Sequence, residues 1–335
     1  MSNWFESVGN TASHFLRNLS NRDDPRSVGL LAAVGSIAAF WALTRPSFDR
    51  RTIPKIYKAP KPSNDALYKY NVFPNGKLLD TPYGRINYYL IGDPAAKKKV
   101  LLVHGISTPV PVWGELPNKL VAAGYQVLMY DLYGRGYSDA PDVTYDLALF
   151  ISQITMLLAA VPSFDKFDII GMSLGGPIAT CFSYYFPERI NKVYLLCPAG
   201  GTPKSQLPLI RRLVLSHYNF IGIRAILSLG PLNPTKAPGI GQWQAKNHPG
   251  FMTAFIGSMA AGPIFGVADL LAETVVRYGD RLRVVWGDAD DVVPMETKKY
   301  WGPGLKVDLI PGGHHWIVQT HTDQVAKFAL AHFEK

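Results

Sequence analysis

The fold is decided by the stretch FDIIGMSLGGPIATCFSYYF, residues 167–186. Its first four residues predict a strand, and its last ten predict a helix. Between them lies Gly171-Met172-Ser173-Leu174-Gly175, in which a glycine stands two positions on either side of a serine. A strand that turns sharply into a helix needs such glycines, because Cβ atoms at those positions would clash. The stretch therefore predicts a serine that projects from a tight strand-to-helix turn.

Short β-rich runs alternate with helical segments of ten or more residues from about Asn71 onward. Candidate strands are Arg85–Ile91, Val100–His104, Gln126–Tyr130, Phe167–Gly171, Val193–Cys197, Leu282–Trp286 and Val307–Ile310. Several are continuous apolar runs, as expected for a parallel sheet covered on both faces. We expect an α/β fold: a mostly parallel, twisted sheet with right-handed crossovers and helices on both faces. Residues 202–266 show helical patches without strands and predict an inserted helical lid.

The composition provides enough apolar residues for one large core or two modest ones. Of 335 residues, 47% are apolar and 18% are charged, which excludes a disordered, collagen-like or small disulfide-rich protein. The two cysteines, Cys181 and Cys197, lie in apolar runs and are predicted to be reduced core thiols. The chain also lacks a strand–GxGxxG–helix unit followed by a ribose-binding acid, so no dinucleotide cofactor is expected.

A second glycine-containing turn is predicted about 70 residues before the serine turn. It follows a predicted apolar strand and consists of Val103-His104-Gly105-Ile106. The glycine lets the chain bend, so that the N–H of Ile106 can donate to a negatively charged oxygen. The N–H of Leu174, at the start of the predicted helix, is a second such donor. His104 is interpreted as a residue that braces this loop.

Acidic residues cluster after a later strand, in Trp286-Gly287-Asp288-Ala289-Asp290-Asp291-Val292-Val293-Pro294. A serine–histidine catalyst needs one carboxylate, which fixes the histidine's tautomer and stabilises its cation. Asp288 and Asp291 also suit turn or helix-capping positions. The residues alone leave three candidates for the acid.

Two histidines follow the last predicted strand, in Pro311-Gly312-Gly313-His314-His315-Trp316. The glycines free the loop, so that one histidine can reach the serine. A metal site would draw on these histidines with His321 and Asp323, but adjacent histidines in such a loop seldom chelate one ion. We therefore expect no metal.

Serine, acid and histidine thus follow one another along the chain, each at the carboxyl end of a predicted strand, where open α/β sheets bind ligands. Over roughly residues 70–335 the chain resembles the α/β-hydrolase fold superfamily, with VLLVHG, YDLYGRGYSD, GMSLGG, WGDADDVVP and PGGHH in family order. The resemblance implies catalytic Ser173, Asp290 and His315, oxyanion donors at Ile106 and Leu174, and a nucleophile elbow framed by Gly171 and Gly175. The family usually has glycine where this chain has His314.

A serine nucleophile implies a different reaction from the aspartate of haloalkane dehalogenases and epoxide hydrolases, which resemble this fold. It implies acyl transfer through an acyl-enzyme that water hydrolyses, without a cofactor. The apolar lid favours a lipophilic carboxylic ester as substrate. Two alternatives stay open: a C–C hydrolase, thioesterase or lactonase with the same residues, and a catalytically silent, membrane-tethered scaffold.

The N-terminal region predicts membrane attachment. VGLLAAVGSIAAFWALT, residues 28–44, is uncharged and as a helix would span about 26 Å, close to the ~30 Å bilayer core. We expect a tail at 1–26 with an amphipathic stripe, a membrane anchor at 27–44, a Pro- and Lys-rich linker at 45–70, and the hydrolase domain at 71–335.

The distribution of charge supports a membrane rather than nucleic acid as partner. The net charge is +9, and residues 1–64 carry nine Lys and Arg against four acids, so most of the excess flanks the apolar segment. Three basic residues precede this segment and six follow it, which places the hydrolase domain on the cytosolic side. The endoplasmic reticulum or a lipid-droplet surface is the expected location, with a mitochondrial membrane as the alternative. The sequence does not predict an oligomeric state.

Overall fold

The computed structural model describes residues 54–64, 67–207 and 239–335. These residues belong to one of two compact units of the chain, and the other unit lies outside them. The predicted tail at 1–26 and the predicted anchor at 27–44 are therefore not described. Within the described ranges, no helix has both the length and the apolar character that crossing a bilayer requires.

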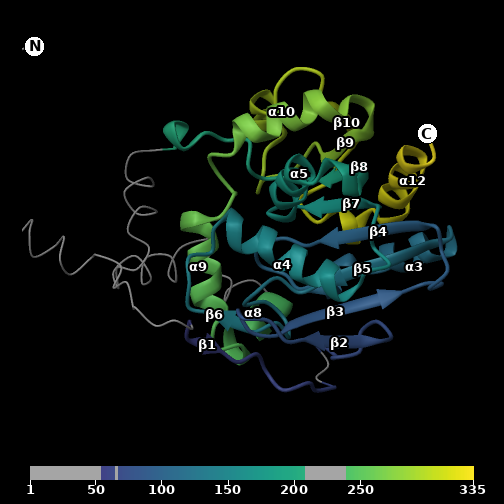
Figure 1. The fold of residues 1–335 in the computed structure, drawn as a ribbon. Coiled ribbons are helices and arrows are strands. Elements are labelled where there is room, and N and C mark those ends of the chain that lie inside the picture. Colours follow the sequence, from purple (N-terminus) through teal and green to yellow (C-terminus); the bar gives the residue numbers. More distant parts are fainter. Residues whose placement is uncertain (1–53, 65–66, 208–238) are drawn as a thin grey trace, which may run out of the picture. The chain divides into compact units, whose positions relative to one another are not determined.

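The centre of the described unit is an eight-stranded sheet (Figure 1). Its strands are β2 (Gly76–Leu79), β3 (Ile86–Ile91), β4 (Lys98–Val103), β5 (Tyr125–Tyr130), β7 (Phe167–Met172), β8 (Ile190–Leu196), β9 (Leu282–Gly287) and β10 (Lys306–Ile310). The spatial order is β10-β9-β8-β7-β4-β5-β3-β2. The pairs from β10 to β5 are parallel, and β3 pairs antiparallel with both β5 and β2. The predicted mostly parallel sheet is thereby confirmed.

Three strands were not predicted from the sequence. β2 is a four-residue edge strand of only partly buried or exposed residues, so it has no apolar run to mark it. β1 (Ile56–Tyr57) and β6 (Ala140–Pro141) form a separate antiparallel pair of two residues each. Segments this short are below the length at which a periodic pattern can be read.

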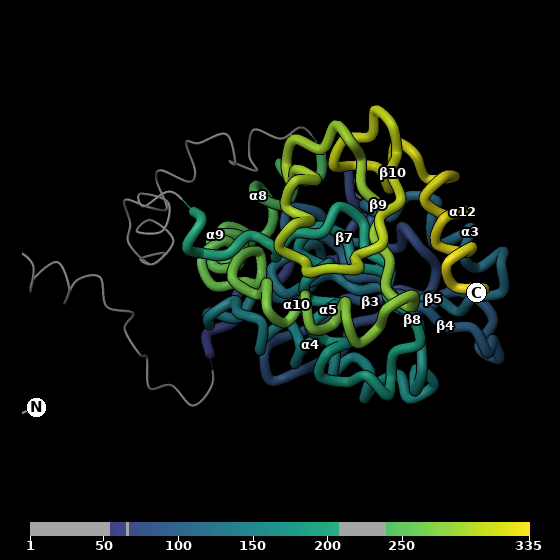
Figure 2. Tube along the Cα trace, turned by 90° about the horizontal axis from the view of Figure 1, so that it is seen from above, coloured from purple at the N-terminus to yellow at the C-terminus, as the bar shows by residue number. Residues whose placement is uncertain are grey.

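Helices cover both faces of the sheet, as predicted. On one face lie α4 (Leu147–Ala160), α5 (Gly175–Tyr185) and α10 (Ala268–Tyr278), and on the other lie α3 (Leu116–Ala122) and α12 (Thr322–Phe333) (Figure 2). Asp146 caps α4, because its carboxylate accepts a 3.0 Å hydrogen bond from the N–H of Leu149. The short elements are η1 (Val110–Trp113), η2 (Pro187–Arg189), η3 (Lys204–Gln206), η4 (Gly279–Arg281), η5 (Met295–Tyr300) and α11 (Ile317–Thr320).

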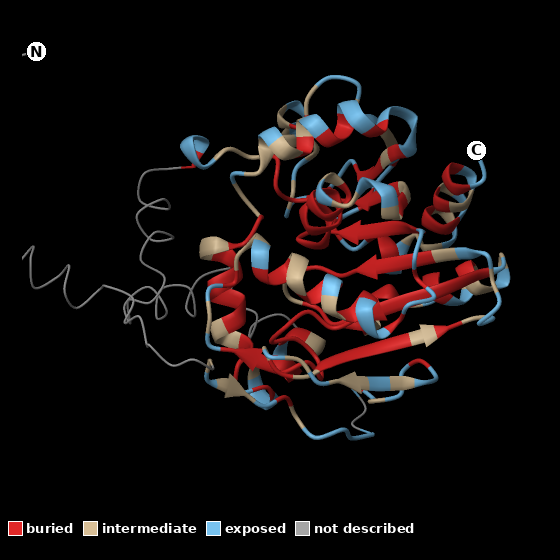
Figure 3. Ribbon diagram, viewed as in Figure 1, coloured by how far each residue is buried: buried red, intermediate tan, exposed pale blue. Residues whose placement is uncertain are grey.

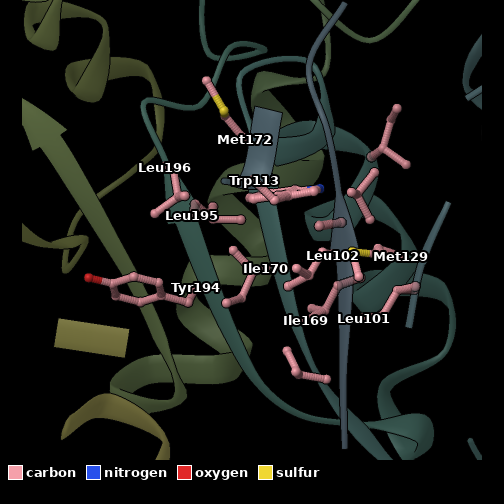
Figure 4. Close-up of a cluster of buried hydrophobic side chains, with 14 of the residues drawn as sticks. Leu101, Leu102, Trp113, Met129, Ile169, Ile170, Met172, Tyr194, Leu195 and Leu196 are labelled. Atoms are coloured by element: carbon pink, nitrogen blue, oxygen red, sulfur yellow. The ribbon is translucent and has the colours of Figure 1, made fainter. Parts of the chain in front are cut away.

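The core lies on both sides of the central strands, and Figure 3 shows these strands as the continuously buried part of the unit. All six residues of β5 and of β7 are buried, because helices pack on both faces of these strands. Figure 4 shows side chains that adjacent strands contribute to this packing: Leu101, Leu102, Ile169, Ile170, Leu195 and Leu196. This rigid sheet fixes the loops that leave its carboxyl edge.

The connection from β8 to β9 holds the predicted insertion. In its described part, η3 is followed after residue 238 by α8 (Ile240–Asn247) and α9 (Phe251–Ala261), and no strand occurs there. Residues 208–238 of the predicted lid lie outside the described residues. We call α8 and α9 the cap helices. Phe251, Phe255, Ile256 and Met259 of α9 form a small apolar cluster, and Ile106 packs against it.

Candidate active site

Ser173 occupies the tight turn between β7 and α5. Its φ angle is +53°, a left-handed conformation that non-glycine residues rarely adopt and that stores strain. Three backbone hydrogen bonds hold it: its N–H donates to Leu196 O at 3.0 Å, and its carbonyl accepts from Gly176 N at 2.9 Å and Ala199 N at 3.0 Å. The strained serine is therefore fixed against the end of the neighbouring strand β8.

Both flanking glycines are required by close backbone packing. A Cβ atom at Gly171 would lie 2.3 Å from the carbonyl oxygen of Gly175, and one at Gly175 would lie 1.9 Å from that of Val103. Real Cβ atoms do not approach so closely, so no side chain fits at either position. The sharp turn thus packs directly on the end of β4.

The loop after β4, residues 104–108, lies beside the serine, and we call it the β4 loop. A Cβ atom at Gly105 would be 3.7 Å from Ser173 Oγ, so the next peptide, with the Ile106 N–H, is close to the hydroxyl. Leu174, on the other side, is the N-cap residue of α5. In the described part of the chain, neither the Ile106 N–H nor the Leu174 N–H donates to a protein acceptor.

A buried histidine–carboxylate pair lies at the ends of β9 and β10. His315 Nδ1 is 2.9 Å from Asp290 Oδ2, and the side chains are almost fully buried. The other oxygen of Asp290 accepts from the N–H groups of Val292 at 2.9 Å and Val293 at 2.8 Å. The carboxylate is acceptor-only, so the bond assigns the proton to Nδ1 and leaves Nε2 as the ring's acceptor nitrogen.

The electrostatics of this pair favour an ionised carboxylate. Burial raises the pKa of Asp290, but the hydrogen bond and charge of His315 and the backbone donor at Val293 outweigh it and leave the pKa below its ordinary value. Asp290 is therefore negatively charged at neutral pH.

The structure separates the residues among which the sequence left a choice. His314 is exposed and His315 is buried against Asp290. Asp288 is exposed and accepts from the N–H of Gly312 at 2.7 Å, while Asp291 is exposed. Of these residues, the fold brings only Asp290 and His315 together.

Ser173 follows β7, which lies two strands from β9, before Asp290, and three strands from β10, before His315. Adjacent strands are about 4.8 Å apart, so the three side chains leave the same edge within a short span. A hydrogen bond from the Ser173 hydroxyl to His315 is not among those made in the described residues. In enzymes without substrate this bond is often long and tightens on binding.

Cys197, which the sequence predicts to be a reduced core thiol, also lies at this site. It follows β8 with φ +44°, and its sulfur and the nearest Asp290 and His315 atoms all lie within 4.8 Å of one another. Burial and the charge of Asp290 raise the pKa of the thiol, so it is protonated at neutral pH. The position of Cys197 in the sequence could have indicated its place at the site. It follows β8, which lies between β7 and β9, the strands that precede Ser173 and Asp290.

His104 braces the β4 loop, as the sequence suggested. Its Nδ1 donates to the carbonyl of Gly105 at 2.8 Å, and its Nε2 accepts from the N–H of Leu132 at 2.9 Å. Burial lowers the pKa of His104 to about 3, so the ring is neutral at physiological pH and can make both bonds.

Comparison with known proteins agrees with this fold. Residues 100–328 match the alpha/beta hydrolase family, and the chain belongs to it. An uncharacterized protein of Mycobacterium tuberculosis is 35% identical over 105 residues, which are 31% of this chain and 30% of that protein. The chain thus covers less than a third of the length of that relative.

A curated relative and a solved structure cover more of the chain. A 2-hydroxymuconate semialdehyde hydrolase of Pseudomonas sp. is 26% identical over 71% of this chain and 86% of that protein. A hydrolase from Pseudomonas aeruginosa has a structure with a TM-score of 0.60 and 22% identity, which covers 78% of this chain and all but 1% of that chain. The structural similarity establishes the fold.

Proposed function

We propose that the protein is a serine hydrolase that cleaves lipophilic carboxylic esters through an acyl-enzyme. The observation that carries the proposal is the combination of a strained serine at a strand-to-helix turn with a buried His315–Asp290 pair at the same sheet edge. A structural turn requires neither the strain nor the buried carboxylate beside a histidine, since both reduce stability unless the surrounding structure compensates.

The mechanism assigns one role to each group. Ser173 Oγ attacks the carbonyl carbon while His315 Nε2 accepts the hydroxyl proton. The negative charge that develops on the carbonyl oxygen is stabilised by the N–H groups of Ile106 and Leu174. Protonated His315, stabilised by Asp290, then gives its proton to the leaving alcohol as the C–O bond breaks. Water, deprotonated by the same ring, hydrolyses the acyl-enzyme.

The apolar cluster on α9 supports a lipophilic acyl group. Phe251, Phe255, Ile256 and Met259 form this cluster, and Ile106, a proposed oxyanion donor, packs against it. Apolar side chains that pack against the proposed oxyanion donor favour an apolar acyl chain over a charged one. Water-insoluble substrates also agree with the proposed membrane anchor at 27–44.

Labelling with a fluorophosphonate tests the nucleophile directly. The wild-type protein is expected to form a covalent adduct, and Ser173→Ala is expected to form none. Ser183→Ala is the matched control, because Ser183 is also buried but its hydroxyl only donates to the carbonyl of Ala179 within α5. A folded wild-type protein that resists labelling, or an adduct that persists in Ser173→Ala, contradicts the proposal.

A second candidate activity is hydrolysis of a carbon–carbon bond. It is favoured by the similarity to the 2-hydroxymuconate semialdehyde hydrolase, which spans 71% of this chain. The same residues can serve both reactions, so substrates must separate them. The ester hydrolase is supported if the protein turns over p-nitrophenyl esters of increasing chain length and does not cleave 2-hydroxy-6-oxo-dienoates. The reverse pattern supports the carbon–carbon hydrolase.

Membrane attachment needs a separate experiment on the full chain. We propose that residues 27–44 anchor the protein with the hydrolase domain facing the cytosol. The protein is then expected to stay with membranes after alkaline carbonate extraction, and Leu31→Arg with Ala38→Arg is expected to release it, because each central arginine costs about 3 kcal/mol of insertion free energy. Extraction of the wild-type protein by carbonate contradicts the anchor.

A further inference from the structure

The β4 loop is held by a row of buried side chains. Its three consecutive carbonyls, of Gly105, Ile106 and Ser107, each accept one side-chain hydrogen bond. The donors are His104 Nδ1 at 2.8 Å, Arg135 Nε at 3.0 Å and Gln244 Nε2 at 2.7 Å, respectively. All three donor residues are fully buried. They come from the loop itself, the loop after β5 and the cap helix α8, so three parts of the fold converge here.

Arg135 is the most costly member of this row. Its guanidinium is completely buried and makes no ion pair within the described residues; its partners are the carbonyls of Ile106, Tyr133 and Ala254 and the hydroxyl of Ser258. Burial lowers the pKa of Arg135 to about 10, so the group is still charged at neutral pH. A buried cation without a counter-ion costs several kcal/mol before its hydrogen bonds offset the loss.

Arg135 and Gln244 join the β4 loop to the cap helices. Arg135 Nη2 donates to Ser258 Oγ at 2.8 Å and to Ala254 O at 3.4 Å, both on α9. Gln244, on α8, accepts from the N–H of Gly136 at 2.8 Å while it donates to Ser107 O. Each residue therefore bridges the β4 loop and a second element.

Peptide geometry connects this row to the proposed oxyanion donor. The carbonyl of Gly105 and the N–H of Ile106 belong to one planar peptide and point in opposite directions. The bond from His104 to Gly105 O therefore sets the direction of the Ile106 N–H. The bonds of Arg135 and Gln244 hold the next two peptides, so that the loop cannot rotate about Ile106 and turn this N–H away. A donor stabilises the transition state only when it is already aimed at the developing charge.

We propose that Arg135 and Gln244 are positioning residues, which orient the Ile106 N–H toward the reacting oxygen. This orientation then depends on the packing of the cap helices against the β4 loop. The inference rests on the proposed serine hydrolase function and deepens it. Neither residue touches the reacting atoms; each acts through the backbone of the β4 loop.

Gln153 offers a matched control for Gln244. Both are buried glutamines that bridge two backbone groups: Gln153 donates to Asp131 O at 3.0 Å and accepts from Tyr133 N at 3.2 Å. Gln153 has no bond to the β4 loop. Gln244→Leu and Gln153→Leu each leave two backbone groups unsatisfied, so their effects on stability are expected to be similar, whereas their effects on catalysis are expected to differ.

The experiment compares the two variants and the wild type in full-length protein with a p-nitrophenyl ester. Gln244→Leu is expected to lower kcat and the rate of fluorophosphonate labelling by roughly 10- to 100-fold, since a small misplacement of catalytic groups costs this much. KM and the midpoint of the kcat pH profile are expected to stay unchanged, because His315 and Asp290 are untouched. Gln153→Leu is expected to keep kcat within about threefold.

Arg135→Lys and Arg135→Met provide the second arm. Lysine keeps the charge and can restore one of the bonds, so it is expected to recover part of the kcat that methionine loses. If Arg135→Met does not fold, Ser258→Ala takes its place. This variant removes the bond from Arg135 Nη2 to Ser258 Oγ and leaves the bond to Ala254 O, with an expected loss of about threefold to tenfold in kcat.

Equal losses of kcat in Gln244→Leu and Gln153→Leu, unchanged kcat in Gln244→Leu, or a shifted pH midpoint overturn the inference. The wild type separates this failure from that of the proposed function. A labelled, active wild type with a fully active Gln244→Leu overturns only the positioning roles, whereas an unlabelled, inactive wild type overturns the serine hydrolase itself.

Discussion

The two sides of Ser173 are built in opposite ways. Toward β9 and β10, the proposed chemistry belongs to the side chains of His315 and Asp290, and backbone N–H groups of residues 292 and 293 hold the carboxylate. Toward β4, the proposed chemistry belongs to the backbone N–H of Ile106, and buried side chains hold the loop. On the β9 and β10 side, side chains take part in the proposed chemistry and backbone groups position them. On the β4 side, a backbone N–H takes part in it and side chains position that N–H.

The two sides therefore differ in how a substitution affects catalysis. A change at Asp290 or His315 removes a reacting group itself, and the effect is expected to be large. On the β4 side no single substitution removes the Ile106 N–H, short of proline at position 106, so changes there act by degrees.

Asp290→Asn is expected to lower kcat by roughly 10⁴-fold, because an amide cannot hold His315 with its proton on Nδ1 or stabilise its cation. The fold is expected to survive, since the amide oxygen can still accept from residues 292 and 293. Steady-state kinetics on a p-nitrophenyl ester measure the loss. Asp288→Asn is the control and is expected to stay within about threefold; a larger loss there would move the acid to position 288.

His104→Asn is expected to lower kcat by about 10- to 100-fold, less than Asp290→Asn, because the Ile106 N–H is misdirected but still present. The shorter side chain cannot both donate to Gly105 O and accept from Leu132 N. The pH profile of kcat is expected to keep its midpoint. A loss of kcat as severe as that of Asp290→Asn would contradict the proposed difference between the two sides of Ser173, since it would show that His104 takes part in the chemistry.

The pH dependence of stability gives an independent test of His104. Its pKa is about 3 in the folded protein and about 6.5 in an unfolded chain, so the unfolded state binds the extra proton first. The contribution of the neutral ring to stability is therefore present above pH 6.5 and is lost progressively as the pH falls toward 3. Urea unfolding at pH 7 and pH 5 is expected to show a smaller loss in His104→Asn than in the wild type.

The comparison between the two proteins isolates His104 from other buried groups. Burial raises the pKa of Asp168 to about 7, which changes stability in the opposite direction with pH, but this group is common to both proteins. An equal loss of stability between pH 7 and pH 5 in the variant and the wild type would show that His104 is not neutral in the folded state.

The smallest expected effect belongs to Cys197→Ala. The thiol interacts with Asp290 and contributes to the lowering of its pKa, so its loss is expected to raise that pKa slightly and to cost about fivefold in kcat, the value of one hydrogen bond. Alanine leaves the main support of the carboxylate, at residues 292 and 293, in place. Kinetics from pH 5 to 8 measure both effects, and an inactive variant would place Cys197 among the reacting groups.

The fold could be predicted from the sequence because the central strands are continuous apolar runs. The strand predicted at Gln126–Tyr130 is β5, which begins at Tyr125, and the strand predicted at Leu282–Trp286 is β9, which ends at Gly287. Burial on both faces leaves a strong local signal. Edge strand β2 is open to solvent and leaves none, so it was missed.

The proposed reacting groups could be read from the sequence because each stands in a local motif at a strand end. Their supports could not. Gln244 and Ser107, which share a hydrogen bond, are 137 positions apart, and Arg135 and Ser258 are 123 apart. Such pairs exist only after the cap helices pack on the sheet, and nothing near Gln244 in the sequence marks it as more than a polar residue of a helix.

The buried guanidinium of Arg135 has a consequence for protein engineering. Cap segments are an obvious target for grafting from one hydrolase to another in order to change specificity. A chimaera of this chain would expose the guanidinium to a foreign helix. Its Nη2 would lose both acceptors unless the donor segment supplied a carbonyl and a hydroxyl where Ala254 and Ser258 now stand. The transplant has to be chosen for its polar inner surface as much as for the pocket it brings.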